Sequence, residues 1–140
     1  AKASSKFRIG VADEPWAVML RDENASRLPI FQVGWLEDFH DPHDWVSPFL
    51  ASQGTFSGTQ GWSKDLYKQM DTLISHAVSN TDSAVRAKDY AQLQQLAYDN
   101  AVSVYLEQPV GRHYEQTWIG GYYYNPIYPG FYYYTFSKGQ

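Results

Sequence analysis

The 140-residue sequence contains no cysteine, which excludes disulfide bridges, zinc–thiolate sites and cysteine nucleophiles. Basic residues are also few: 11 Lys and Arg face 15 Asp and Glu, with no basic arm or stripe, so we expect no binding of nucleic acid. No run approaches the roughly 20 apolar residues that a membrane span requires. The length suits one folding unit and is too short for two independent domains with a cleft between them.

The sequence motifs of several large enzyme classes are missing as well. There is no Gly-x-Ser-x-Gly nucleophile elbow, and no glycine-rich turn of a dinucleotide site or P-loop follows the first predicted strand. These absences count against a hydrolase with a nucleophile elbow and against an enzyme that binds a dinucleotide or a nucleoside triphosphate.

Two kinds of apolar spacing are present. Alternating apolar residues predict strands over residues 7–12 and 102–107, and residues 28–35 predict a strand that is buried on both faces. Apolar residues three and four positions apart predict helices over residues 15–25, 42–49, 63–77 and 82–100, the last two forming a hairpin. The predicted caps of these helices are Asp13, Asp41, Ser63 and either Thr81 or Asp82. The initial strand, helix and strand indicate a βαβ unit and therefore a mixed α/β fold.

Aromatic residues make up 17% of the chain, and 12 of them are Tyr. They concentrate between Tyr114 and Phe136, where Gly, Pro and Asn interrupt the sequence and predict short extended segments joined by turns. Three interpretations stay open: a stacking platform for carbohydrate, the core of a sheet, or a surface that packs on a partner. A partner surface is attractive because contiguous exposed aromatic residues are a liability for a monomer.

An acidic loop, residues 36–45, contains four carboxylates and two histidines directly after a predicted strand. Binding residues often follow strands in α/β proteins. Trp35 and Asp38 could place an aromatic wall beside a carboxylate, an arrangement that suits an ammonium group next to an apolar side chain. In the alternative interpretation Trp35 belongs to the core and Asp38 caps a turn.

The two histidines of this loop, His40 and His43, lie three residues apart among aspartates, a donor set compatible with a metal ion. The spacing alone is weak evidence. We favour an arrangement without metal, in which Asp41 and Asp44 cap the helix that begins at Pro42 and the histidines form hydrogen bonds within the loop. A metalloenzyme built on the two histidines is the opposing hypothesis.

Several segments resemble, in order, the peptide-binding class of periplasmic solute-binding proteins, which supply ABC importers and include dipeptide, oligopeptide and nickel receptors. The first is residues 31–45, Phe-Gln-Val-Gly-Trp-Leu-Glu-Asp-Phe-His-Asp-Pro-His-Asp-Trp. The others are two helical segments, a returning strand and a C-terminal signature, at residues 71–77, 86–94, 102–108 and 118–126. The resemblance covers essentially the whole chain.

This resemblance implies a type II periplasmic-binding-protein fold, of which the chain corresponds to the C-terminal portion. Residues 1–108 would form part of the second lobe, and residues 109–140 a crossover and a tail that packs on the first lobe. The implied function is solute capture for an importer, with a peptide, a sugar or a metal chelate as ligand. We therefore expect a protein that is not an enzyme and that needs no cofactor. The implied location is periplasmic or extracellular, with attachment to the membrane through the permease or a lipid anchor.

The resemblance also implies which residues act. Asp38 would pair with the α-ammonium group of a peptide, Trp35 and Phe39 would line the pocket, and Glu37 is a neighbour that could take the role of Asp38. The hinge between lobes would comprise Gln108, Pro109, Val110, Gly111 and Arg112.

Two further expectations follow if the first lobe is absent. The chain alone should bind peptide weakly or undetectably, because a one-walled site buries little of its ligand. It should also self-associate through residues 122–136. The alternative from a different class is an independent carbohydrate-binding module that uses Trp62, Trp118 and the Tyr runs.

Overall fold

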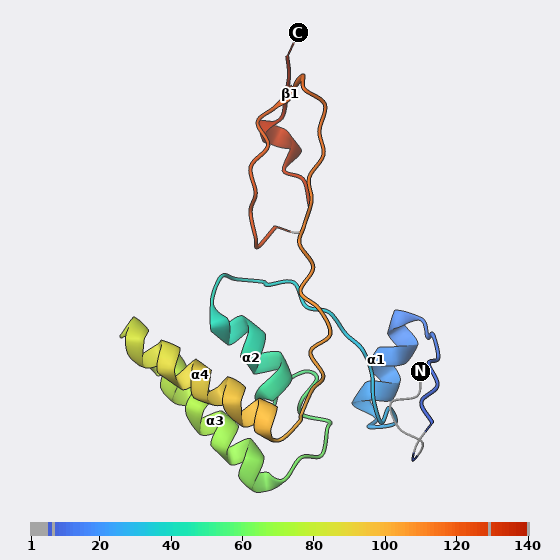
Figure 1. Ribbon diagram of the computed structural model, residues 1–140, viewed down its shortest axis with the longest axis vertical. Coiled ribbons are helices and arrows are strands. Elements are labelled where there is room, and N and C mark those ends of the chain that lie inside the picture. Colours follow the sequence, from blue (N-terminus) through green and yellow to red (C-terminus); the bar gives the residue numbers. More distant parts are fainter. Residues whose placement is uncertain (1–5, 7, 129, 140) are drawn as a thin grey trace. The chain divides into compact units, whose positions relative to one another are not determined.

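A computed structural model describes residues 6, 8–128 and 130–139 of the chain (Figure 1). The chain divides into two compact units, residues 1–32 and 33–140. The elements are α1 (Trp16–Asn24), α2 (Pro42–Leu50), α3 (Lys64–Ser79), α4 (Ser83–Asp99), β1 (Ile119–Gly120), the 3-10 helix η1 (Tyr133–Thr135) and β2 (Ser137–Lys138). Within the described ranges, none of the helices has the length and apolar content that crossing a bilayer requires.

The N-terminal unit contains the predicted helix, but its first turn is not capped as predicted. The carbonyl of Pro15 accepts hydrogen bonds from the N–H groups of Val18 and Met19, and no side chain caps the helix. Pro15 itself occupies the cap position, which leaves Asp13 too early in the chain to reach the first turn. The prediction of an Asp13 cap is therefore wrong.

The three predicted strands are wrong for the residues that the structure describes; Phe7 lies outside them. Residues 8–12, 28–35 and 102–107 belong to no sheet. Val11, Ile30 and Val104 are 92%, 80% and 83% exposed, so these apolar side chains bury little surface. An extended segment forms a strand only where a neighbouring strand completes the hydrogen-bond ladder. Among the described residues, the sheet consists of β1 and β2, and none of these segments belongs to it. The predicted βαβ unit and mixed sheet are thus absent from this part of the chain.

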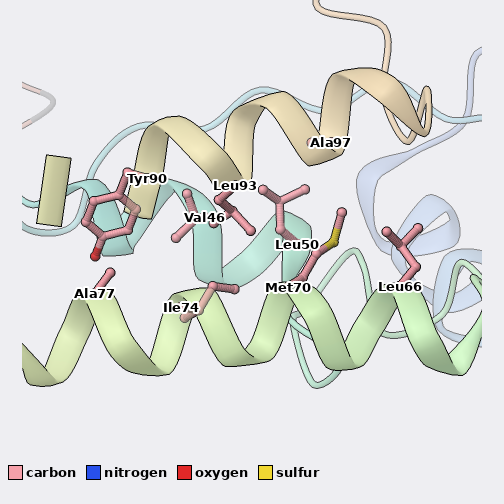
Figure 2. Close-up of a cluster of buried hydrophobic side chains, with 9 residues drawn as sticks. All are labelled: Val46, Leu50, Leu66, Met70, Ile74, Ala77, Tyr90, Leu93 and Ala97. Carbon is pink, nitrogen blue, oxygen red and sulfur yellow. The ribbon is translucent and has the colours of Figure 1, made fainter. Parts of the chain in front are cut away.

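The second unit is built on the predicted helical hairpin. Helices α3 and α4 pack along each other, and α2 packs against α3 (Figure 1). The Ser63 hydroxyl accepts a hydrogen bond from the N–H of Leu66 at 3.2 Å, and the Asp82 carboxylate accepts from Ala84 at 2.8 Å, which confirms both caps. Figure 2 shows the core between these helices. It consists of Val46, Leu50, Leu66, Met70, Ile74, Ala77, Tyr90, Leu93 and Ala97.

The described part of the aromatic tail, residues 113–128 and 130–139, contains short extended segments and turns as predicted, together with the 3-10 helix η1, which was not predicted. Strands β1 and β2 are antiparallel, with Ile119 opposite Lys138. The Thr135 hydroxyl donates to the carbonyl of Gly121 at 2.8 Å, and the rings of His113 and Tyr122 stack with centroids 3.7 Å apart. None of the described tail residues is fully buried, so these contacts do not form a sheet core.

Candidate functional site

The acidic loop leads into the N-terminus of α2, and Asp41 caps that helix. One carboxylate oxygen of Asp41 accepts a hydrogen bond from the N–H of His43 at 2.8 Å, which confirms the predicted cap. The other oxygen accepts from the guanidinium of Arg86 on α4. The loop is therefore tied to a helix more than 40 residues further along the chain, a contact with no local signal in the sequence.

Asp44 does not cap α2, and that part of the prediction is wrong. Its side chain is buried, and one oxygen, Oδ2, accepts two hydrogen bonds of 3.0 Å: one from Nε1 of Trp35 and one from the backbone N–H of Asp38. The carboxylate thus bonds to the segment before the helix and not to the free N–H groups of the first turn. Asp44 joins two of the residues that the sequence predicts for the ligand site.

Glu37 has both carboxylate oxygens engaged. Oε1 lies 3.0 Å from Nδ1 of His40, and Oε2 accepts a hydrogen bond of 3.3 Å from Nε1 of Trp45. His40 thus forms the expected hydrogen bond within the loop. No group of three or more His, Asp or Glu side chains that could hold a metal ion occurs among the residues described.

Asp38 is exposed, and its carboxylate makes no hydrogen bond or ion pair with any residue in the described ranges. The other three carboxylates of the acidic loop are all bonded inside the chain. Phe39, next to Asp38, is 47% exposed. The acidic loop therefore presents one available carboxylate, and the next residue along the chain carries an accessible aromatic ring.

Trp35 packs at the edge of the hydrophobic core. Its ring meets Phe49 and Phe56 edge-on, with centroid distances of 5.8 and 6.2 Å, while those two rings stack on each other at 5.1 Å. The side chain is half-buried and its N–H is bonded to Asp44. Packing and hydrogen bonding together fix Trp35 in place, three residues before Asp38.

Two polar side-chain atoms, one on α2 and one on α4, are buried without a partner in the described part of the chain. Within the described structure, the Tyr90 hydroxyl and Nδ1 of His43 have no hydrogen-bond partner. The hydrogen bond within the loop that was expected of His43, as of His40, is therefore absent at this nitrogen. Burial raises the pKa of Tyr90, and the nearby Asp41 carboxylate adds to this effect because it disfavours a second negative charge. Arg86, whose guanidinium lies 5.7 Å from the Tyr90 ring centroid, partly offsets it.

Comparison with known proteins gives three relatives, all named as binding proteins. Di/tripeptide-binding protein 4 of Pseudomonas aeruginosa is 26% identical over 125 residues, 89% of this chain and 23% of the relative. Heme-binding protein A of Haemophilus influenzae is 28% identical over 74% of this chain and 19% of its own length. A probable D,D-dipeptide-binding periplasmic protein of Escherichia coli is 30% identical over 91% of this chain and 22% of its own length.

The chain resembles the C-terminal part of periplasmic solute-binding proteins of the peptide-binding class. It spans roughly a fifth to a quarter of the length of these relatives. No protein-family model matches the chain. No solved structure matches it either.

The acidic loop is recognisable in the sequence, but the contacts of Asp44 and Arg86 that fix its conformation are not. Asp38 and Phe39 are exposed, and Trp35 and Glu37 are half-buried. Trp35 and the Asp38 backbone are brought together by Asp44. The predicted hinge residues, 108–112, are exposed and in no regular element, and their role stays a prediction.

Proposed function

We propose that the chain supplies one wall of the ligand site in an extracytoplasmic peptide receptor that serves an ABC importer. In this proposal Asp38 receives the α-ammonium group of the peptide. The observation that carries it is the free carboxylate of Asp38 in a loop whose other three carboxylates are occupied. Two of the three relatives are named for binding dipeptides or tripeptides, which supports a peptide as ligand.

The chemistry of the acidic loop suits a peptide N-terminus. An ammonium group donates charge-assisted hydrogen bonds to a carboxylate, and these are stronger than hydrogen bonds between neutral groups. The exposed ring of Phe39 offers an apolar contact for the first side chain of the peptide. Glu37 contributes negative charge nearby, but its oxygens already accept from His40 and Trp45.

The remaining parts of the proposal concern a longer receptor. Residues 1–108 would belong to the second lobe of a type II periplasmic-binding-protein fold, and residues 109–140 to a crossover and a tail that packs on the first lobe. Lobe closure would pivot about residues 108–112 and stabilise the liganded form that the permease recognises. Such a receptor would work in the periplasm or outside the cell.

The test is a titration of the isotope-labelled chain with dialanine and with N-acetyl-dialanine, followed by NMR. We expect millimolar binding of the free amine, shifts centred on residues 36–45, and no binding by the acetylated peptide. Asp38→Asn should remove this difference, whereas Asp65→Asn, which alters an exposed carboxylate on α3, should leave it unchanged. Equal binding of both peptides would reject Asp38 as the anchor.

The same substitution has a defined effect in a complete receptor. Asp38→Asn should weaken peptide binding by about 1.5 to 3 kcal/mol, the range for a hydrogen bond to a charged group. In the isolated chain, calorimetry should detect no binding at micromolar peptide, and tight binding there would contradict the one-walled site.

A carbohydrate-binding module is the second candidate, favoured by the exposed rings of the aromatic tail. Trp118 is partly exposed, and the ammonium group of Lys138 lies 4.9 Å from its ring centroid. The second predicted platform, Trp62, stacks on Tyr67 at 5.2 Å, so one of its faces is covered. Sugar binding by the chain alone, lost in Trp118→Ala, would favour this candidate over the peptide receptor.

A further inference from the structure

A single buried oxygen atom forms hydrogen bonds with two residues that the sequence predicts for the peptide site, Trp35 and Asp38. Oδ2 of Asp44 accepts a hydrogen bond from the Trp35 indole and another from the Asp38 backbone N–H, each 3.0 Å long. The Asp44 residue is only 4% exposed. Leaving a buried carboxylate without hydrogen-bond partners costs free energy. Breaking either of the two hydrogen bonds of Asp44 is therefore unfavourable.

We propose that Asp44 is the positioning residue for the ammonium anchor. It fixes the backbone of Asp38 relative to Trp35, so that the Asp38 carboxylate is held ready for a ligand without bonding to the chain. This inference rests on the proposed function of Asp38. It assigns to Asp44 a role that differs from the helix cap expected from its sequence position.

The surroundings of Asp44 make it a firm support. It belongs to the first turn of α2, whose N-terminus is capped by Asp41 and tied to α4 through Arg86. On the other side, Trp35 is held edge-on by Phe49 and Phe56. Both ends of the Asp44 contact are therefore anchored in packed structure. Pre-organisation of this kind strengthens binding because the loop loses less freedom when the ligand arrives.

Two substitutions separate hydrogen bonding from charge. In Asp44→Asn the side-chain carbonyl oxygen still accepts both hydrogen bonds, since both reach the same oxygen in the native residue. In Asp44→Leu neither bond can form, while an apolar side chain of similar size fills the space. If Asp44 positions the anchor, Asn should preserve the site and Leu should not.

The first readout needs no ligand. Hydrogen exchange of the Asp38 amide and of the Trp35 indole, followed by NMR, should accelerate by about tenfold or more in Asp44→Leu. Exchange in Asp44→Asn should stay within about threefold of the native chain. The amides of α3 and α4 provide the control, because a general loss of stability would accelerate their exchange as well.

The second readout is the preference for dialanine over N-acetyl-dialanine. Asp44→Leu should lose this preference, and Asp44→Asn should retain most of it. Unchanged Asp38 protection or unchanged preference in Asp44→Leu would overturn the positioning role, as would an Asp44→Asn chain that behaves like the Leu variant with intact helices. A native chain that shows protection at Asp38 but no preference would instead reject the proposed function, and the ligand role of Asp44 with it.

Discussion

The helical region and the aromatic tail are both rich in apolar side chains, yet they differ in where these side chains lie. In residues 42–99 the apolar faces of three helices meet, and side chains such as Met70 and Leu93 are completely buried. In residues 113–139 the rings touch one another but none of the described residues is fully buried. Apolar content alone therefore does not produce a core.

The difference follows from how each region satisfies its backbone. A helix pairs its own N–H and C=O groups, so the α3–α4 hairpin needs only matching apolar faces to become stable. Extended segments need neighbouring strands, and the tail has a sheet of only two residues per strand. Two-stranded ribbons are marginally stable in water.

The largest effect is expected when one apolar side chain in each region is replaced by alanine. Leu93→Ala should lower the free energy of unfolding by about 2 to 5 kcal/mol, because it leaves a cavity in the core. Tyr134→Ala, at an 88% exposed position of the tail, should change it by less than about 0.5 kcal/mol. Urea unfolding followed by circular dichroism measures both. Similar losses would mean that the tail contributes to the cooperative core.

A glycine substitution tests whether the exposed tail still has a defined conformation. Gly121 has a φ of +86°, and a Cβ atom there would collide with the carbonyl of Thr135. Gly121→Ala should therefore cost the tail about 1 to 3 kcal/mol through backbone strain. NMR shifts should change throughout residues 118–138 and stay constant in the helices. The matched control is Gly111→Ala, where a Cβ meets no atom within 4 Å.

The exposed rings should also drive self-association. We expect the chain to form oligomers through residues 122–136, and replacement of Tyr124, Tyr133 and Tyr134 by Ser should weaken that association by about tenfold or more. Sedimentation or light scattering at high concentration measures the effect. A strictly monomeric native chain would contradict the prediction.

The smallest effect concerns a polar atom inside the core. Tyr90→Phe removes a buried hydroxyl that lacks a hydrogen-bond partner among the described residues, so stability at neutral pH should stay constant or rise by up to about 1 kcal/mol. The control is Tyr134→Phe, which alters an exposed hydroxyl. Urea unfolding at neutral pH compares the two variants.

Alkaline pH gives the same substitution a second readout. Burial raises the pKa of Tyr90 above its usual 10.0, so the folded state favours the protonated phenol. The stability that this preference gives is fully present below pH 10 and is lost as the pH rises through the folded-state pKa. The native chain should therefore lose more stability above pH 10 than Tyr90→Phe does. Equal losses would show that Tyr90 does not titrate with unfolding.

The sequence predicts what depends on neighbouring residues. Helix positions and the Asp41, Ser63 and Asp82 caps follow from residues within one or two turns, and the structure confirms them. The predicted strands over residues 8–12, 28–35 and 102–107 are wrong, because an apolar pattern indicates a local preference while a strand exists only with a partner.

The candidate site divides in the same way. The concentration of acids after Trp35 is visible in the sequence, and so is the capping position of Asp41. The roles of Asp44 and Arg86 depend on contacts that sequence spacing does not reveal, one directed back along the chain and one reaching across to another helix. Which of the four carboxylates stays free therefore required the structure.

The occupied carboxylates of the acidic loop bear on how many amine groups of a ligand it can bind. Glu37, Asp41 and Asp44 are bonded within the chain, so under the proposed function Asp38 anchors one amine at a time. Under the proposed function, a peptide that carries a lysine has two amines competing for Asp38, so it would occupy the site in two alternative registers. A lysyl peptide with a blocked N-terminus would then bind in reverse, through its side chain.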